Sequence, residues 1–202
     1  MAPTNLDEHD GVPAILREQL TSLLTRHTLD DVVLVRVLIE HYNEIAATAN
    51  RGDTRRARRD YQSLSERVPL PDSHEIKVIL DSFALPVSAL IYWRDGRNRL
   101  AREELVGSLE ACADLVASYG HTFVTCRQLH LANNYVRVLV SEGKTGEAAS
   151  LTTALRLVIS GDTARWPFVG AETLVLPLVG DWRDAIEMQL LKLEHQLQMT
   201  PH

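Results

Sequence analysis

The sequence predicts an all-α protein built from repeated helical hairpins, and three observations lead to this prediction. Apolar residues recur at helical spacing along most of the chain. Hydrophobic residues make up 45% of the chain but aromatic residues only 5%, which favours helices over sheets. A glycine followed five residues later by an alanine occurs four times, at Gly52/Ala57, Gly96/Ala101, Gly143/Ala148 and Gly180/Ala185. Four copies of one signature in 202 residues indicate a repeat protein.

The glycine and the alanine of this signature have distinct physical roles. Glycine ends a helix in the left-handed conformation without steric cost. The alanine falls in the first turns of the next helix, where a small side chain lets antiparallel helices approach within the roughly 8–10 Å that larger residues require. The expected packing partner lies seven positions before each glycine, at Ile45, Ala89, Val136 and Thr173.

A helix, a glycine turn and a second helix with a small inward residue resemble tetratricopeptide (TPR) repeats. Tyr92 and Leu139 precede their glycines by four positions, and Pro69 closes the first hairpin where a TPR proline would. The glycines are 44, 47 and 37 residues apart, whereas the TPR period is about 34, and the usual aromatic near the start of each first helix is missing. The resemblance covers roughly residues 31–198 and implies a right-handed stack of about four hairpins.

The N-terminal part adds one helix to that stack. Residues 1–11 show no periodicity and are expected to form a loose tail, with residues 12–202 as a single domain. An apolar face over residues 12–24 predicts an extra N-terminal helix. Thr28 or Asp30 is expected to cap the helix that follows.

The first hairpin contains one ambiguous run. Residues 31–50 open with VVLVRVLI, and β-branched residues are typical of strands. The helical spacing continues well beyond the length of a strand, so a helix is favoured. Gly52 ends it, Asp53 or Thr54 caps the second helix, and Pro69 ends the hairpin.

The second hairpin contains a proline in its first helix. Residues 72–75 read as a capping box that opens this helix. Pro86 predicts either a kink or the start of a new helix. Gly96 then turns the chain into a long helix from Asn98 to about Tyr119.

The C-terminal part begins with a central hairpin over residues 131–157. Trp166 opens a fourth hairpin, whose first helix is weakened by Gly170 and Pro177. The last helix starts near Trp182 and carries an apolar stripe that predicts self-association, with a homodimer slightly favoured over a monomer. The stripe consists of Ile186, Leu190, Leu193 and Leu197.

Composition restricts the classes of partner and compartment. A net charge of −6 argues against general nucleic-acid binding. No apolar run approaches the roughly 20 residues that cross a bilayer, and the acidic start lacks the apolar core of a signal peptide. Cys112 and Cys126 are expected to be buried free thiols in a reducing cytoplasm.

Motifs for catalysis, metals and cofactors are weak, so a non-enzymatic protein without metal or cofactor is favoured. Gly143-Lys144-Thr145 is similar to a phosphate-binding loop, but position 138 is Val where that loop needs glycine. The histidines show no metal-ligand spacing, and His41 with Glu44 is more simply a surface contact.

The resemblance to TPR proteins implies a concave groove lined by first-helix residues, where Asn and Arg hold peptide backbone and carboxylates. Two adjacent asparagines inside a helix are locally unfavourable, which indicates either a binding role or hydrogen bonds to a neighbouring helix. The candidate groove residues are Tyr42, Leu90, Trp93, Arg94, His130, Asn133, Asn134 and Arg137.

Arginines also cluster in the first two repeat turns. The favoured interpretation is a solvated face paired with nearby carboxylates such as Asp53, Asp60, Glu103 and Glu104. The alternative is a basic docking edge for an acidic or phosphate-bearing partner. The edge would comprise Arg55, Arg56, Arg59, Arg97 and Arg99.

These observations favour a cytoplasmic module that binds a protein or peptide in the groove, as an adaptor, a chaperone or the sensor part of a regulatory system. The alternative is a helical enzyme or small-molecule-binding protein. Its pocket would lie between hairpins near Tyr92, Trp93, His130 and Arg137. The sequence does not identify the partner.

Overall fold

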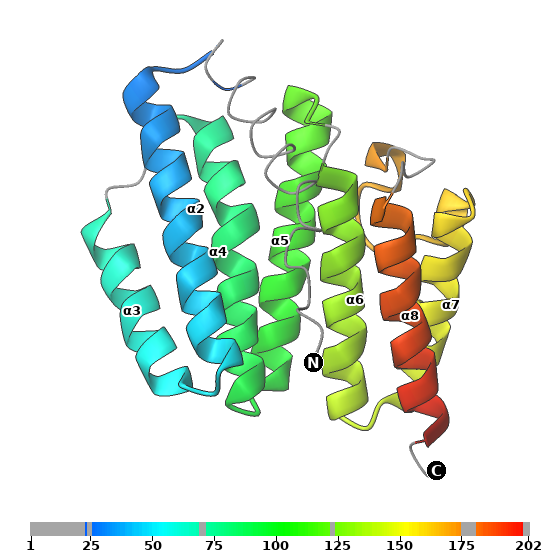
Figure 1. Ribbon diagram of the computed structural model, residues 1–202. Helices are drawn as coiled ribbons and strands as arrows, with labels where there is room; N and C mark the ends of the chain where they lie inside the picture. The colour runs from blue at the N-terminus through cyan, green and yellow to red at the C-terminus, as the bar shows by residue number, and fades with distance from the viewer. Residues whose placement is uncertain (1–22, 24–25, 69–71, 122–123, 175–180, 200–202) are drawn as a thin grey trace, which may run out of the picture.

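The described part of the chain is helical throughout, which confirms the all-α prediction. The computed structural model describes residues 23, 26–68, 72–121, 124–174 and 181–199, and these contain no strand (Figure 1). The α-helices are α2 (Leu29–Asn50), α3 (Thr54–Arg67), α4 (His74–Arg94), α5 (Asn98–Tyr119), α6 (Thr125–Ser141), α7 (Thr145–Ile159) and α8 (Asp181–Met199). Two 3₁₀ turns are η2 (Thr163–Arg165) and η3 (Ala171–Thr173).

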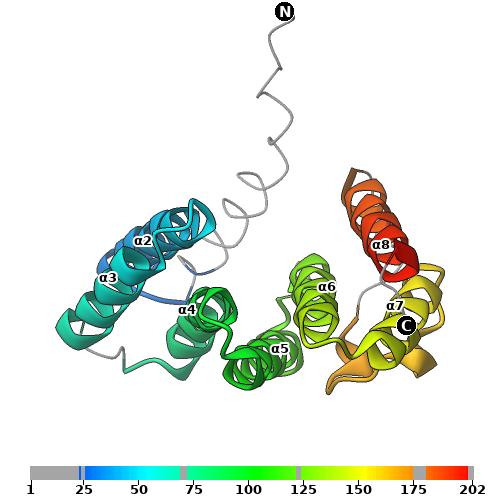
Figure 2. The ribbon, with the colours of Figure 1, turned by 90° about the horizontal axis from the view of Figure 1, so that it is seen from below.

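The helices form a curved array of two layers. Figure 2 shows α2, α4, α6 and α8 along the concave side and α3, α5 and α7 along the outer side. The hairpins α2–α3, α4–α5 and α6–α7 each contribute one helix to each layer. Helix α2 packs on α4, α5 on α6, and α7 on α8, so the array is continuous.

The three hairpin turns share one geometry. Gly52, Gly96 and Gly143 have φ angles of 93°, 73° and 74°. The N–H of the residue after each glycine reaches back to the carbonyl five positions earlier, at 3.3, 2.9 and 3.0 Å respectively. This bond defines the Schellman motif of helix C-termini. All three turns lie at the same end of the array (Figure 1).

The alanines of the signature are buried where the two helices of each hairpin meet. Ala57, Ala101 and Ala148 each have an exposed fraction of 0%. Their expected partners Ile45, Ala89 and Val136 are also buried. The predicted burial of the alanines and their partners is therefore confirmed for three hairpins, whereas Gly180 and the side chain of Ala185 lie outside the described residues.

The predicted first helix of a fourth hairpin is wrong over its described residues. Gly161 repeats the turn, with φ of 104° and a bond of 2.9 Å from Asp162 N–H to Leu157 O. The position five residues after this glycine, however, is occupied by Trp166, which is buried at 6% exposure. Gly170, inside the predicted helix, has a left-handed φ of 80°, which interrupts an α-helix, and the chain continues through η2 and η3 instead. The predicted N-terminal helix lies mainly outside the described residues.

The predicted caps of α2 and α3 agree with the structure, whereas the predicted cap of α4 does not. Thr28 caps α2 in a capping box with Asp31, and Asp53 caps α3. Helix α4 is capped by Ser73, whose hydroxyl accepts from Ile76 N–H at 3.4 Å. The predicted box over residues 72–75 is therefore wrong, and the Glu75 side chain serves a different contact.

Glu75 ties the segment before α2 to the start of α4 and the end of α5. Glu75 is buried, with an exposed fraction of 4%. Its carboxylate oxygens lie 2.7 Å from His27 Nε2 and 2.6 Å from His121 Nε2. Arg26 Nη2 adds a salt bridge at 2.9 Å. Burial raises the pKa of Glu75, but the hydrogen bonds from both histidines and the charge of Arg26 outweigh it and leave the pKa below its ordinary value.

The predicted self-association stripe on α8 is internal. Ile186, Leu190 and Leu193 are buried and Leu197 is half-buried in the core, where α8 packs on α6 and α7. Packing on the central hairpin is therefore what covers this stripe. Among the α8 side chains that the structure describes, the large apolar ones that remain exposed are Met188 and Leu191.

Helix α4 is the most apolar helix of the array. By length and composition it would suit a bilayer, with a mean hydropathy of 1.5 over its most apolar window, and it is the only described helix that does so. More than half of that window is buried inside the protein. Its apolar surface therefore serves the core, against α2 and α5.

Glu75→Gln is predicted to lower the free energy of unfolding at pH 7 by about 1–3 kcal/mol, because the buried network loses its negative charge and one of its two acceptor oxygens. The folded-state pKa of Glu75 lies below 4.5, its ordinary value. Its contribution is therefore present above pH 4.5 and lost as the pH falls through the folded pKa. Chemical denaturation at several pH values should show the two proteins converging in acid. Glu40→Gln, at an exposed pair with Arg36, is the control; a Glu75→Gln deficit that persists unchanged at the lowest pH would contradict this role.

Candidate binding groove

A proline inside α4 creates the local feature that organises the groove. Pro86 lacks the N–H that would bond to the carbonyl of Ser82 four residues earlier, yet α4 continues through it. A buried carbonyl without a partner is unfavourable. Ser108 of α5 donates to this oxygen at 3.1 Å, and Arg127 of α6 donates from Nε at 3.0 Å and from Nη2 at 2.5 Å. One freed carbonyl thus joins three helices.

Arg127 is held by a carbonyl and an aromatic ring, without a carboxylate. Its guanidinium carbon lies 3.8 Å from the centroid of the Phe83 ring. No described carboxylate forms an ion pair with it, and its Nη1 has no hydrogen-bond partner among the described residues. Burial lowers the pKa of Arg127, and nearby Cys112 partly opposes this effect. The guanidinium nevertheless stays charged near neutrality.

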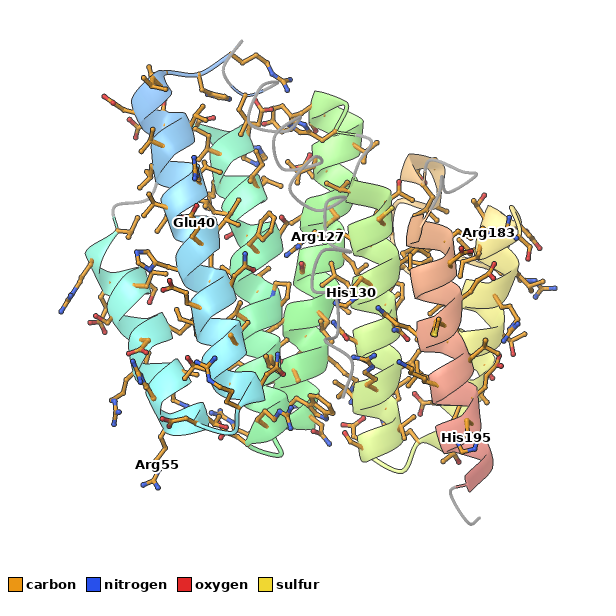
Figure 3. The ribbon with its side chains drawn as sticks, in the orientation of Figure 1. Glu40, Arg55, Arg127, His130, Arg183 and His195 are labelled. Atoms are coloured by element: carbon orange, nitrogen blue, oxygen red, sulfur yellow. The ribbon has the colours of Figure 1, made fainter. Side chains whose placement is uncertain are left out.

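Arg127 begins a row of polar side chains on one face of α6. Positions 127, 130, 134 and 137 are spaced by three, four and three residues, which places them on the same side of a helix. Arg127, His130, Asn134 and Arg137 all line a cavity of about 340 Å³; Figure 3 labels the first two. From the first arginine to the last the row rises about 15 Å along α6.

The opposite wall of the cavity is apolar and comes from α4. Phe83, Val87, Leu90 and Trp93 line it at helical spacing. Asn43 and Asn50 of α2 add amide groups beyond that wall, and no acidic side chain contributes to the lining. The groove therefore combines cations and amides on two helices with apolar surface between them.

His130 is neutral within this row. Its side chain is exposed along the groove, yet protein on its other sides removes part of its hydration. Desolvation, followed by the charges of Arg127 and Arg137, lowers the pKa of His130 to about 4, although a hydrogen bond with Gln189 opposes the shift. A neutral imidazole can accept or donate a hydrogen bond. The positive charge of the groove near neutral pH comes from the two arginines.

Arg137 also lacks a carboxylate partner in the described part of the chain. Its Nη1 donates to Asn134 Oδ1 at 3.2 Å, within the same helix. Burial lowers the pKa of Arg137, which reflects a partly desolvated cation without a nearby anion. The remaining N–H groups can bond to a carboxylate or phosphate in bidentate fashion.

Five of the residues predicted for the groove line the cavity: Leu90, Trp93, His130, Asn134 and Arg137. Trp93 Nε1 also donates to Ser141 Oγ at 2.9 Å, which links α4 to the end of α6.

Three predicted residues lie elsewhere. Tyr42 packs beside Tyr61, with ring centroids 6.1 Å apart, and Arg94 is exposed and donates to Asn50 at 3.4 Å. The expected groove position of Asn133 is wrong: this residue is 0% exposed and donates to Gln189 of α8 at 2.6 Å. Of the two adjacent asparagines, one therefore bonds to a neighbouring helix and the other faces the groove.

Sequence reasoning missed Arg127 and Phe83. The predicted central hairpin began at residue 131, whereas α6 begins at Thr125, so Arg127 fell outside the expected helix. The spacing of Arg127 from His130, Asn134 and Arg137 was the available signal. Phe83 would have followed from a continuous α4 across Pro86.

The arginines of the repeat turns lie apart from the cavity. The turns that carry them are neighbours at one end of the array (Figure 1), and Arg55 points away from α3 at that end (Figure 3). Several pair locally: Arg56 with Asp60 at 3.5 Å, Arg99 with Glu103, and Arg58 with Asp95. Arg97 lies over the Tyr92 ring at 4.8 Å. Local pairing thus accounts for much of this charge.

The described residues do not form a reactive-cysteine site or a cluster of metal ligands. Cys112 and Cys126 are free thiols, the first buried and the second half-buried, and burial raises the pKa of Cys112 to about 11. A thiol with so high a pKa is a poor nucleophile. No group of three or more His, Cys, Asp or Glu side chains in the described ranges is arranged to hold a metal ion.

Comparison with known proteins gives no match: no family model, no curated protein and no solved structure is significantly similar to this chain. The class of site is therefore defined by its geometry: a concave groove in which two arginines, without a carboxylate partner in the described part of the chain, lie opposite an apolar wall.

The pKa of His130 should rise when Arg137 is replaced by Gln, because one of the two cations that disfavour the imidazolium is removed. Titration of the imidazole followed by NMR should place the wild-type value at about 4. Arg183→Gln, at an exposed pair with Glu187 on α8, is the control and should leave the titration unchanged. An ordinary wild-type titration near 6.5 would show that His130 is not desolvated as described.

Proposed function

We propose that this chain is a non-enzymatic module that binds a protein or peptide segment in the concave groove. The observation that carries the proposal is the row of Arg127, His130, Asn134 and Arg137, which faces an apolar wall without an internal carboxylate. Desolvating a cation without pairing it is unfavourable. Arg127 also bonds to the Ser82 carbonyl, but Arg137, whose hydrogen bond to Asn134 stays within α6, is more readily explained by an external anion than by the stability of the fold.

The shape and chemistry of the groove suit an extended segment. Side chains of an extended peptide alternate between two sides at about 3.3 Å per residue. One side would place acidic residues along α6, and the other would place apolar residues along α4. The rise of about 15 Å between the two arginines then corresponds to four or five residues.

We further propose that the array is a divergent TPR-like stack. Three hairpins with the same glycine turn and buried alanine support this proposal, as does the position of first helices on the concave side (Figure 2). In TPR proteins the first helices hold the ligand. An adaptor, a chaperone or the sensor part of a regulatory system would each use such a groove.

A small-molecule site is the second candidate, and the size of the cavity favours it. A volume of about 340 Å³ lies at the lower end of the range for small-ligand pockets. A small organic acid could place its carboxylate against Arg137 and its apolar body against Trp93. A thermal-shift panel of metabolites, nucleotides and metals, run beside a peptide library, separates the two candidates. If a metabolite raises the melting temperature by several degrees and no library peptide binds, the small-molecule site becomes the favoured function.

Arg137→Ala is predicted to weaken binding of an acidic peptide selected from such a library by about 1.5–3 kcal/mol, through loss of a charge-assisted hydrogen bond. Fluorescence anisotropy measures this change. The matched control is Arg183→Ala, which removes an exposed arginine outside the groove. If the Arg137→Ala variant is folded and binds the peptide with unchanged affinity, the groove is not the binding site.

A further inference from the structure

Neither groove arginine, Arg127 or Arg137, has a carboxylate partner among the described residues, and the chain has one acidic segment outside them. Residues 1–11 contain Asp7, Glu8 and Asp10 and no Lys or Arg. Residues 12–22, which also lie outside the described residues, carry one acid, Glu18, beside one base, Arg17. The other such segments carry no Asp or Glu: 24–25, 69–71, 122–123, 175–180 and 200–202.

The acidic run is flanked by apolar residues. Leu6 precedes it, and Val12, Ile15 and Leu16 follow it. This composition matches a groove that has cations on α6 and apolar side chains on α4. In a polyproline II conformation, which has three residues per turn, Asp7 and Asp10 fall on the same side of the chain and are about 9 Å apart. That spacing is compatible with two arginines whose Cα atoms are about 15 Å apart, because each side chain can lean toward the other.

The attachment point of the segment lies near one end of the groove. Leu23 is buried in the core at 1% exposure. Arg26 bonds to the carbonyl of Tyr119 at 3.3 Å and to Glu75 at 2.9 Å. Tyr119 ends α5, and α6 with Arg127 begins a few residues later. The thirteen residues from Asp10 to Leu23 reach about 20 Å if helical and about 40 Å if extended.

We propose that the chain's own N-terminal segment, residues 6–16, occupies the groove when no external partner is bound. The inference rests on the groove being a binding surface, as proposed above. Tethering supplies an effective concentration on the order of millimolar, so a weak acidic segment suffices to occupy the site. An external partner would have to displace this segment, and partner binding is thereby autoinhibited.

The test uses a fluorescein-labelled peptide of residues 1–16 as the probe, added to the full-length protein. The variant Asp7→Asn/Glu8→Gln/Asp10→Asn keeps the chain length and neutralises the internal competitor. Fluorescence anisotropy should show that this variant binds the probe at least ten-fold more tightly than the wild type does. Adding Arg137→Glu to the variant should abolish the gain, whereas adding Arg183→Glu should preserve it. A probe with the same three neutral substitutions should not bind.

Equal affinity of the probe for the wild type and for the neutralised variant would overturn the inference. So would a neutralised variant that binds acidic library peptides but not the probe, and in that case the proposed function would stand. If the probe binds the variant through Arg137 while no library peptide binds, the segment remains the occupant and the proposed external partner is lost. Arg127 is left unchanged in these variants because its contact with Ser82 supports the fold.

Discussion

The carbonyl of Ser82 is the point on which the groove depends. Pro86 removes its helical donor, and side chains from α5 and α6 supply the replacement. This requirement fixes the guanidinium of Arg127 against α4, over the Phe83 ring. A residue that would ordinarily extend into solvent is thereby held at the inner surface of the array. The same contact joins the second hairpin to the third, so the shape of the groove and the charge within it have a common cause.

The hairpins set the frame in which this contact forms. Each left-handed glycine reverses the chain in the same way, and each buried alanine allows the helices to approach closely. Repetition of that geometry brings α2, α4 and α6 to the concave side (Figure 2). The face of α6 that points there carries Arg127 and Arg137 but no carboxylate. Stability and binding thus place different demands on two arginines of one helix: the first completes the backbone bonding of α4, and the second bonds only within α6.

Most of the fold, but less of the site, could be predicted from sequence. Glycine conformation and small-residue packing are local properties, so the three hairpins followed from the spacing of Gly52, Gly96 and Gly143. The predicted helix after Gly161 failed where Gly170 takes a left-handed conformation and the chain forms 3₁₀ turns instead. The site depends on contacts distant in sequence. Asn133 and Asn134 are indistinguishable as neighbours, and only the position of α8 assigns one to Gln189. To predict the position of Arg127, one would have to know that Pro86 leaves the Ser82 carbonyl without its helical donor.

The most direct test of this account is a double-mutant cycle between Pro86 and Arg127, measured by chemical denaturation. Pro86→Ala restores an N–H that can bond to the Ser82 carbonyl, and Arg127→Met removes the guanidinium while keeping an apolar side chain. Arg127→Met should lower the free energy of unfolding by about 1–3 kcal/mol in the wild-type background. In the Pro86→Ala background the loss should be smaller by about 1 kcal/mol, because the carbonyl is already satisfied. The same loss in both backgrounds would show that Arg127 is not held in the groove by the carbonyl that Pro86 frees.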